Sequence, residues 1–521
     1  MISRFTLKPG EYFWGGSTAY GTDMPITAGS SYSRDFRQNP SNQMMPLFLS
    51  SEGRYIWSED TFKVWVDGDE LCFDGGTFEL WEGGNCLRDA YLAAMEAHFP
   101  FRETRVDGKK LPREFFMTAQ YNSWMEFTYH PTQAGILEYA HAIIDHGFEP
   151  GILIIDEGWH TRYGQWKFDF AAFPDPKAMV DELHRLGFKV MLWVTPMVTP
   201  DGQEFIMDTR ADFNPESWDK LFLRTKDNKV ALVEWWNGFS AILDFRKECD
   251  RQYLDSTLQF RMKEYGVDGF KFDGGSYAMY RPEHIQNGEA QDDHNAEALN
   301  VAWNEFGARY TFHEYKDTFK GGGKATIQRL RDRGHCWDGD GINTLLPCSI
   351  LQGLMGHPFI CPDMIGGGEW SYNMRPGFKI DEELFIRMAQ ASALFPMMQF
   401  SWAPWRALSE GSYKIVAEAG QLHKRMADKI IALVADAEKT GEPILRALEY
   451  ADPHKGYAHI TDEYLLGNDI LVCPIITKGT TEKDVTFPAG RWMAEDGSIY
   501  DGNSVVRLAA PMERLLWFRR V

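Results

Sequence analysis

The spacing of hydrophobic and polar residues changes twice along this chain. Residues 1 to about 112 contain short alternating runs, such as RYIWSEDTFKVWVDGDELCFDGGTFELWEGG, that are broken by Asp-Gly and Gly-Gly pairs. A period of two residues interrupted by glycine turns is typical of antiparallel strands. We therefore predict a small all-β domain, similar to a β-sandwich, over residues 1–112.

From about residue 113 the pattern changes to short apolar runs separated by amphipathic stretches. This alternation predicts parallel strands joined by helical crossovers. One such stretch, residues 132–148, has Gly147 as a C-terminal cap and places on one helical face Ile136, Leu137, Ala140, Ile143 and Ile144. The candidate strands are FFMTAQYN (115–122), GILIIDEGW (151–159), FKVMLWVTP (188–196), GFKFDGG (269–275), ATIQRL (325–330), HCWDGD (335–340), PFICPDMIGG (358–367) and FPMMQFS (395–401).

Eight strands with helical links over roughly 300 residues predict an α/β fold, a (β/α)8 barrel, for residues 113–436. The active site of such a barrel lies at the carboxyl ends of its strands. A doubly wound open sheet is the main competing prediction, and no GxGxxG motif opens a helix here. Residues 437–521 return to alternating patterns, as in KDVTFPAGRWMAEDG, and predict a C-terminal all-β domain.

Composition and charge restrict the class of partner. The net charge of −21 argues against nucleic acid and acidic membrane surfaces, because proteins bind both through an excess of Lys and Arg. Aromatic residues make up 14% of the chain, including 18 Trp, and their faces suit the apolar side of a sugar ring. A small neutral carbohydrate therefore fits better as the substrate.

The expected location is the cytoplasm. The seven cysteines are scattered and include no CxxC pair, which favours reduced thiols over disulfides or a zinc site. The first residues, MISRFTLKPGEYFWGG, do not follow the pattern of a signal peptide, and no window of about 18 apolar residues occurs. We expect a soluble protein, and the exposed edges of two β domains would allow homo-oligomers.

Polar residues at the predicted strand ends would converge in one pocket of the barrel. They are Asp156, Glu157, Trp193, Lys271, Asp273, Arg329, Trp337, Asp338, Asp340 and Asp363. A single Asp before two glycines is more often a turn residue than a catalytic one. Several such residues on successive strand ends favour a polar site of the size of a sugar.

Two carboxylates are sufficient for glycoside hydrolysis, and Asp273 and Asp340 are the predicted pair. One would act as nucleophile and the other as acid and then base. Lys271 precedes Asp273 by two residues, so strand alternation places both side chains on one face. We expect its ammonium group to keep the Asp273 carboxylate ionised, although a structural salt bridge explains this lysine equally well.

Several segments from residue 113 onward resemble glycoside hydrolase family 31. The long segment ILIIDEGWHTRYGQWKFDFAAFPDPKAMVDELHRLGFKVMLWVTP is similar to that family's second and third barrel strands. GFKFDGG resembles the family's nucleophile strand and implies that role for Asp273. HCWDGD resembles the W-x-G-D acid/base motif, which implies Asp340 and makes Asp338 only a neighbour. GHPFICPDMIGGG resembles the seventh strand and brings in Asp363.

Within that family the chain looks most like the branch of the myogenesis-regulating glycosidase and similar α-galactosidases. LVEWWNGFSAILDF and FPMMQFSWAPWR are similar to segments of this branch. The resemblance implies that Trp236 lines the subsite of the cleaved sugar and that Asp156, Glu157 and Arg329 bind its hydroxyl groups. Arg333 is a second candidate for this arginine. A retaining α-galactosidase that needs no metal or organic cofactor is the function that the resemblance implies.

Two positions depart from the family's pattern. The family's α-glucosidases carry a histidine shortly after the Phe-Pro pair of the eighth strand, and Ser401 is the corresponding residue here, which argues against a glucose-type site. Ser276 stands where the branch often has a glutamate, three residues after Asp273.

Other functions stay open on the sequence. They are α-glucoside, α-xyloside or α-N-acetylgalactosaminide hydrolysis, a Mg²⁺-dependent barrel enzyme using Asp156, Glu157, Asp273 and Asp363, and a non-catalytic glycan-binding relative.

Overall fold

The computed structural model of the chain describes residues 2–38, 42–101, 110–201, 221–372 and 374–521. Its contacts divide the chain into two compact units. The first unit contains Met1–Arg105, Arg113–Ala119 and Lys320–Val521, and the second contains Val106–Pro112 and Gln120–Phe319. The predicted domain boundaries at residues 112 and 436 stay predictions.

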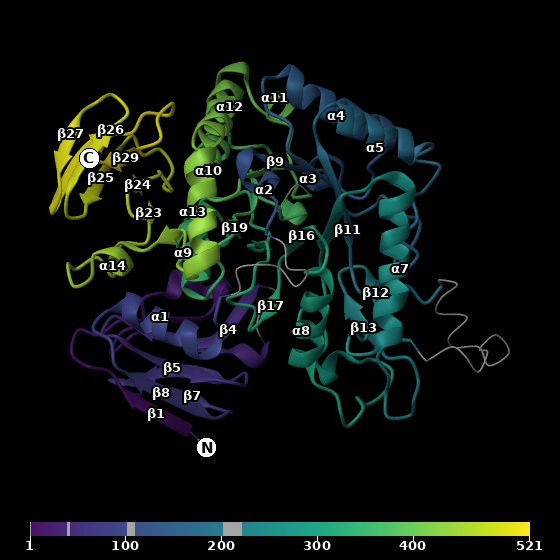
Figure 1. Cartoon of the computed structure of the whole chain (residues 1–521), viewed down its shortest axis with the longest axis horizontal. Helices are drawn as coiled ribbons and strands as arrows, with labels where there is room; N and C mark the ends of the chain where they lie inside the picture. Colours follow the sequence, from purple (N-terminus) through teal and green to yellow (C-terminus); the bar gives the residue numbers. More distant parts are fainter. Residues whose placement is uncertain (1, 39–41, 102–109, 202–220, 373) are drawn as a thin grey trace. The chain divides into compact units, whose positions relative to one another are not determined.

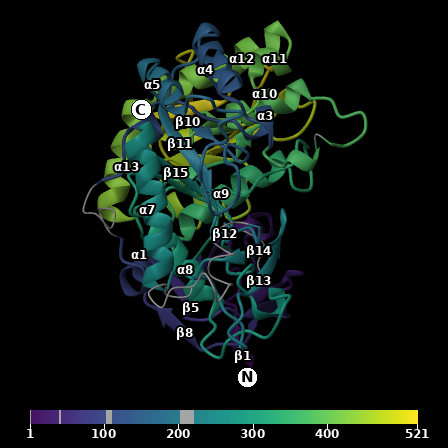
Figure 2. The ribbon, with the colours of Figure 1, turned by 90° about the vertical axis from the view of Figure 1, so that its right-hand side faces the viewer.

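A parallel sheet forms the centre of the second unit. Its described strands, in spatial order, are β9 (Gln120–Asn122), β10 (Ile152–Ile155), β11 (Lys189–Val194), β15 (Gly269–Phe272) and β16 (Phe312–Tyr315). Helices α4 (Gln133–Asp145), α5 (Pro176–Arg185), α7 (Glu248–Tyr265) and α8 (Ala296–Gly307) lie between these strands in the chain. Figure 2 shows β10, β11 and β15 side by side, with α7 running alongside them. This is the strand and helix alternation that the sequence predicts.

Helix α4 begins and ends where its sequence predicts. The Thr132 hydroxyl accepts a hydrogen bond from the Gly135 N–H and caps the first turn. Ile136, Ala140 and Ile143 are buried as predicted, whereas Leu137 is only partly buried and Ile144 is exposed, because both lie at the border of the buried face. Gly147 follows the helix with φ +79°. This left-handed conformation ends the helix at low cost only for glycine.

One predicted barrel strand does not form, and one observed strand was not predicted. Residues 335–340 form a series of bends, so the predicted strand HCWDGD is wrong. The strand after β15 is β16, which pairs with β15 in parallel. Its sequence, FHEY, lacks the continuous apolar run that identifies a buried strand, yet His313 and Glu314 are both buried.

The second unit also contains a small antiparallel sheet, whose strands lie between β11 and β15 in the sequence and include a hairpin. It consists of β12 (Met197–Val198), β13 (Leu232–Trp235) and β14 (Gly238–Ile242). Trp235 pairs with Gly238, so Trp236 and Asn237 form a two-residue tip. Gly238 has φ +90°, a conformation that favours glycine in a tight hairpin.

The N-terminal part of the first unit contains two antiparallel sheets. One orders β1 (Ile2–Thr6), β7 (Glu70–Asp74), β6 (Lys63–Asp67) and β3 (Ser33–Asp35), and the other contains β2 (Phe13–Ser17), β4 (Gln43–Ser50), β5 (Arg54–Ser58) and β8 (Phe78–Glu82). Phe48 of β4 and Phe73 of β7 join the two sheets, with ring centroids 5.5 Å apart. This packing of two sheets confirms the sandwich-like prediction.

The remaining predicted barrel strands lie in the first unit and form two short parallel pairs. Strand β18 (Gln328–Arg329) pairs with β19 (Ile360–Cys361), and β20 (Met364–Ile365) pairs with β21 (Gln399–Phe400). These strands are much shorter than predicted. The predicted strand 115–122 is also short, because its first half forms helix α2 (Glu114–Met117).

The C-terminal part of the first unit is built from β-sheets, as predicted. A sheet orders β22 (Leu445–Arg446), β23 (Tyr464–Leu466), β24 (Ile470–Val472), β29 (Trp517–Arg520), β26 (Arg491–Ala494) and β27 (Ile499–Asp501), and β25 (Glu482–Phe487) pairs with β28 (Ser504–Ala509). Trp492, Phe487 and Phe518 are fully buried in its core. Figure 1 shows helices α10 (Glu382–Ser392), α12 (Glu410–Arg425) and α13 (Ala427–Thr440) beside these yellow strands.

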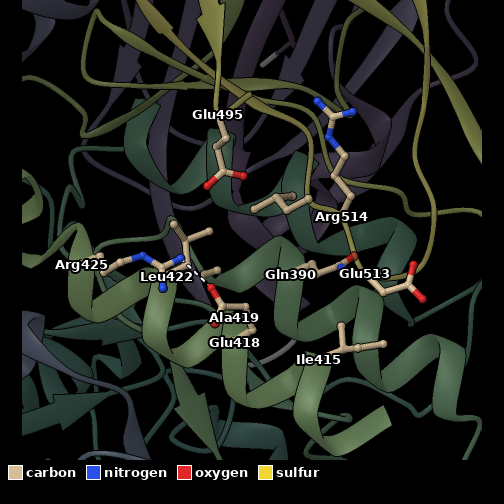
Figure 3. Close-up of a pocket in the computed structure, with 11 residues that line it drawn as sticks. Gln390, Ile415, Glu418, Ala419, Leu422, Arg425, Glu495, Glu513 and Arg514 are labelled. Carbon is tan, nitrogen blue, oxygen red and sulfur yellow. Dashed lines mark hydrogen bonds and ion pairs between the residues drawn. The ribbon is translucent and has the colours of Figure 1, made fainter. Parts of the chain in front are cut away.

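A small pocket lies where α10 and α12 meet the loops of the C-terminal sheets (Figure 3). It holds about 90 Å³, well below the roughly 300–1,000 Å³ of most small-molecule sites. Its Arg425 side chain pairs with Glu418 at 2.7 Å. We assign no ligand to it.

Among the helices of the described residues, none has the length and apolar character needed to cross a membrane.

Gly269, the first residue of β15, provides a test of the parallel sheet. A methyl group there would lie 2.0 Å from the Phe312 carbonyl oxygen of β16. We expect Gly269→Ala to lower the melting temperature, because overpacking of this kind typically costs about 1–3 kcal/mol.

Gly411→Ala is the matched control, because Gly411 lies in α12 with open space around it. Alanine in an exposed helix is favoured over glycine by about 0.5–1 kcal/mol, so this variant should melt at the same temperature or higher. Thermal unfolding followed by circular dichroism measures both. An unchanged melting temperature for Gly269→Ala would contradict the packing of β15 against β16.

Candidate active site

Acidic side chains meet at the carboxyl edge of the parallel sheet in the second unit. Asp156 and Glu157 follow β10, and Asp273 follows β15. All three are buried, with 2%, 3% and 7% of their surface exposed. Buried carboxylates must be paired or hydrogen-bonded, so the neighbours of each decide what this edge can do.

Asp156 is held by a lysine and an amide. The Lys271 ammonium lies 2.6 Å from Asp156 Oδ2, and Asn122 Nδ2 donates to the same oxygen at 2.7 Å. The Asp156 N–H donates to the Ser123 hydroxyl at 2.8 Å. The closest acidic partner of Lys271 is therefore Asp156 on another strand, while Asp273, the partner that alternation predicted, lies 4.0 Å away.

Asp273 accepts hydrogen bonds at both carboxylate oxygens. The Trp193 indole N–H donates to Oδ2 and the Gly274 backbone N–H donates to Oδ1, each at 2.9 Å. The Lys316 ammonium, just after β16, lies 3.4 Å from Oδ1. Donors and cations around a carboxylate favour its ionised form, which is the form a nucleophile needs.

The turn after Asp273 requires glycine. Gly274 and Gly275 both have φ +66°. A methyl group on Gly274 would lie 2.6 Å from the Thr195 hydroxyl and 3.5 Å from Cη2 of Trp236. The two glycines therefore allow a tight left-handed turn directly after Asp273 and leave room for the Trp236 ring beside Gly274.

Glu157 is held by the loop after β10 and by the hairpin tip. The Tyr163 hydroxyl and Asn237 Nδ2 donate to Oε1 at 2.6 and 2.5 Å, and Trp236 Nε1 lies 3.3 Å from Oε2. Burial raises the pKa of Glu157 to about 7; the hydrogen bond from Tyr163 lowers it, and the Asp156 and Asp273 charges raise it. Glu157 is thus poised to change its charge near neutral pH.

Trp236 is the most exposed of the three predicted tryptophans, Trp193, Trp236 and Trp337, with 44% of its surface accessible. Its ring lies 6.5 Å from that of Trp193, which is buried and uses its indole N–H on Asp273. Trp236 therefore offers a face to a sugar, while Trp193 orients the carboxylate.

The first unit contains a second cluster at the ends of β18 and β19. Arg329, the last residue of β18, is fully buried and donates from Nη1 to Asp332 and Asp363, both at 2.8 Å. A methyl group on Gly368 would lie within 3 Å of an oxygen of each aspartate, so this glycine leaves room for both carboxylates.

Asp363 organises the backbone around this second cluster. It accepts hydrogen bonds from the N–H groups of Arg333 at 2.6 Å, Met364 at 2.7 Å and Gly368 at 3.0 Å. Burial and the charge of Asp332 raise the pKa of Asp363, and the nearby arginines oppose this shift. Asp363 thus fixes the loop that follows Asp332 as well as pairing with Arg329.

The residues of the predicted strand 335–340 lie in a loop. Asp340 is paired with Arg331 at 2.5 Å, and its side chain is 38% exposed. Trp337 donates to Asp381 at 3.0 Å, at the start of α10, and Asp338 is exposed. The arginine alternative, Arg333, is buried and donates to the Thr344 hydroxyl at 2.8 Å.

Two serines mark the departures from the family pattern. Ser276 is buried, and its carbonyl accepts the Met279 N–H at 2.9 Å in a turn. Ser401 follows β21 and is fully buried.

Sequence patterns missed several residues of these clusters. Lys316 was missed with strand β16. Asp332 comes three residues after the end of β18, which is shorter than the predicted strand 325–330 and ends at Arg329. A count of acidic residues just beyond β18 would have found Asp332. Tyr163 and Asn237 lie in loops that no pattern places, so only the folded structure reveals them.

Family models match most of the chain. The model described as "Glycosyl hydrolases family 31 TIM-barrel domain" matches residues 110–430, and "Glycosyl hydrolase family 31 C-terminal domain" matches residues 441–520. The barrel match includes both acidic clusters and confirms the predicted barrel.

Relatives and solved structures agree with this match. The chain is 30% identical to the myogenesis-regulating glycosidase of Mus musculus over 77% of its own length and 55% of that protein. It is 24% identical to alpha-glucosidase 2 of Bacillus thermoamyloliquefaciens, over 92% of this chain and 61% of that protein. The chain thus spans little more than half the length of these relatives.

Among solved structures, the dextranase of Flavobacterium johnsoniae complexed with glucose superposes with a TM-score of 0.83 at 18% identity. The superposition covers 100% of this chain and 66% of the dextranase chain, and supports the same fold. On the family models and the relatives together, the chain belongs to glycosyl hydrolase family 31.

Proposed function

We propose that this protein is a retaining α-glycosidase that hydrolyses terminal α-linked sugars, with Asp273 as its nucleophile. The observation that carries this proposal is the environment of Asp273. This buried carboxylate lies at a barrel strand end, where hydrogen bonds from Trp193 and Gly274 fix its direction and the nearby Lys316 ammonium favours a negative charge.

The reaction has two steps. In the first, an Asp273 oxygen attacks the anomeric carbon while an acid protonates the glycosidic oxygen, which leaves as an alcohol. In the second step the residue that acted as the acid is a carboxylate and serves as the base. It removes a proton from water, and the water oxygen attacks the anomeric carbon. The C–O bond to Asp273 breaks, and the sugar leaves with its α configuration retained.

Two aspartates of the first unit are candidates for the acid. Asp340 fits the family's W-x-G-D motif, but it lies in the loop 335–340, where its side chain is 38% exposed and pairs with Arg331. Asp332 comes three residues after the end of β18, and Arg329 joins it to the buried Asp363. Catalytic residues of such barrels follow directly from strand ends, so we favour Asp332.

Sugar recognition falls to Trp236, Asp156 and Glu157 in this proposal. The exposed Trp236 face suits the apolar side of a sugar ring, and the two carboxylates accept hydrogen bonds from its hydroxyl groups. We propose an α-galactoside as the preferred substrate, because Ser401 replaces the histidine expected of the family's α-glucosidases. Relatives named α-glucosidase, 1,3-alpha-isomaltosidase and alpha-xylosidase keep other α-glycosides as the alternative.

A magnesium enzyme is less compatible with these side chains. Lys271 and Lys316 lie against Asp156 and Asp273, so cations already neutralise the carboxylates that a metal would need. A chelator should leave the activity unchanged.

A cytoplasmic location and homo-oligomers stay predictions.

The first test compares turnover of the 4-nitrophenyl α-galactoside, α-glucoside, α-xyloside and α-N-acetylgalactosaminide. We expect the highest kcat/KM for the α-galactoside. Asp273→Asn should reduce kcat roughly a thousandfold or more, because loss of a nucleophile typically removes most of the rate enhancement.

Asp268→Asn is the matched control, because Asp268 precedes the same strand at its opposite end and pairs with His184 and Lys189. This variant should lower the melting temperature and leave kcat/KM within about threefold of the wild-type value, because residues at the amino ends of barrel strands contribute to stability. Full activity in Asp273→Asn would contradict the proposed nucleophile, and turnover of none of the four glycosides would favour a non-catalytic glycan binder.

The acid/base residue is identified by azide. Removal of the acid/base should slow the second step by about 10²–10⁴-fold, because water then lacks its base. Azide needs no base, so it should restore turnover of an activated α-galactoside and yield the α-galactosyl azide. We expect this rescue in Asp332→Ala, with Asp340→Ala remaining within a few-fold of wild type. Rescue in Asp340→Ala alone would assign the role to Asp340.

A further inference from the structure

Glu157 is bound on one oxygen much more tightly than on the other. Oε1 accepts two short hydrogen bonds, from the Tyr163 hydroxyl and from Asn237 Nδ2. Among the residues that the structure describes, Oε2 has only the 3.3 Å hydrogen bond from Trp236 Nε1. A carboxylate oxygen has two lone-pair directions for strong bonds, so Oε1 is saturated and Oε2 retains capacity for a ligand.

Tyr163 and Asn237 also hold one another. Asn237 Nδ2 lies 2.8 Å from the Tyr163 hydroxyl oxygen, so the two side chains and Glu157 Oε1 form a closed triangle. The Tyr163 ring packs edge-on against Trp235 at 4.9 Å, which ties the loop to the hairpin. The triangle therefore connects the loop after β10 with the tip between β13 and β14.

We propose that Tyr163 and Asn237 are positioning residues that fix the Glu157 carboxylate, leave Oε2 for a hydroxyl group of the bound sugar, and keep the group ionised for that contact. This rests on the proposed function, in which Glu157 contacts the sugar. The triangle also sets the place of Trp236, because Asn237 is its neighbour at the hairpin tip. The same two residues therefore position both Trp236, which contacts the face of the sugar ring, and Glu157, which contacts a hydroxyl group.

The charges that face Glu157 make its ionisation sensitive to these bonds. Asp156 beside it and Asp273 on β15 are acidic and oppose its negative charge. Lys271 is directed to Asp156, at 2.6 Å, and Lys316 to Asp273, at 3.4 Å. On the loop side, burial lowers the pKa of His160 to about 3, so this ring is neutral and does not stabilise the glutamate.

The hydrogen bond from Tyr163 therefore has a predictable sign. It lowers the pKa of Glu157 against burial and the two aspartates. Without it the pKa of Glu157 rises, and more of the enzyme carries a neutral Glu157 at pH 6–7. If the ionised form binds the sugar, the acidic limb of kcat/KM moves to higher pH.

The test measures pH profiles of kcat/KM and KM for wild type, Tyr163→Phe and Asn237→Asp. Phenylalanine keeps the ring and removes the donor, while aspartate keeps the shape and adds a like charge. We expect each to move the acidic limb up by roughly half a pH unit or more and to raise KM at pH 6.5 about five- to tenfold, with kcat much less affected.

Tyr253→Phe is the matched control. The Tyr253 hydroxyl donates to the Gly164 carbonyl of the same loop at 2.7 Å and makes no bond to the glutamate among the described contacts. It should leave the limb in place. Limbs and KM values of Tyr163→Phe and Asn237→Asp that match those of Tyr253→Phe would overturn the proposal.

Galactose affinity, measured by calorimetry between pH 5.5 and 8.5, separates this proposal from the proposed hydrolysis. A wild type that binds galactose without turnover would contradict hydrolysis, and weaker binding by Tyr163→Phe at low pH would still support the positioning role. A wild type that neither binds nor hydrolyses any of the sugars would overturn both.

Discussion

The acidic edge of the parallel sheet depends on one buried ammonium group. Lys271 is 3% exposed and lies 2.6 Å from Asp156 and 4.0 Å from Asp273. With Lys316 it gives two positive charges against the three carboxylates of Asp156, Glu157 and Asp273. Buried charges are tolerated only when they are compensated, so one negative charge remains in excess. That excess, with burial, accounts for the raised pKa of Glu157.

The three carboxylates have different partners and therefore suit different roles. Asp156 is tied to Lys271 and an amide, Asp273 has an indole and a backbone donor, and Glu157 relies on neutral donors from two loops. An ionised Asp273 suits nucleophilic attack, whereas a glutamate that titrates near neutrality suits adjustable contact with a neutral sugar. The barrel supplies the rigid strand ends, and the loop and hairpin tune the last group.

The sequence predicts the parts of this arrangement that depend on local pattern. Alternation and turn residues identify the N-terminal sandwich, the helix at 133–145 and the strand leading to Asp273. Lys271 was correctly assigned to the face of Asp273, but its closest partner depends on the order of β10, β11 and β15, which no local pattern contains. Strand β16 was missed because polar His313 and Glu314 replace the apolar run that the prediction requires.

Contacts made by loops could not be foreseen for the same physical reason. Tyr163 and Asn237 are more than 70 residues apart in the chain, and their meeting depends on the packing of a loop against a hairpin tip. Asp340 was chosen through a motif, whereas its loop and its pairing with Arg331 became visible only in the fold. Family membership fixes the barrel but leaves the substrate to side chains such as Trp236 and Ser401.

In the proposed mechanism Asp273 forms a covalent bond with the sugar, and trapping that bond tests the mechanism most directly. A 5-fluoro-galactosyl fluoride slows both steps and lets the glycosyl-enzyme accumulate, after which peptide mass spectrometry locates the label. We predict one added fluorosugar on the peptide that contains Asp273, with none in Asp273→Asn. A label on another carboxylate, or an active enzyme that accumulates no adduct, would contradict this account.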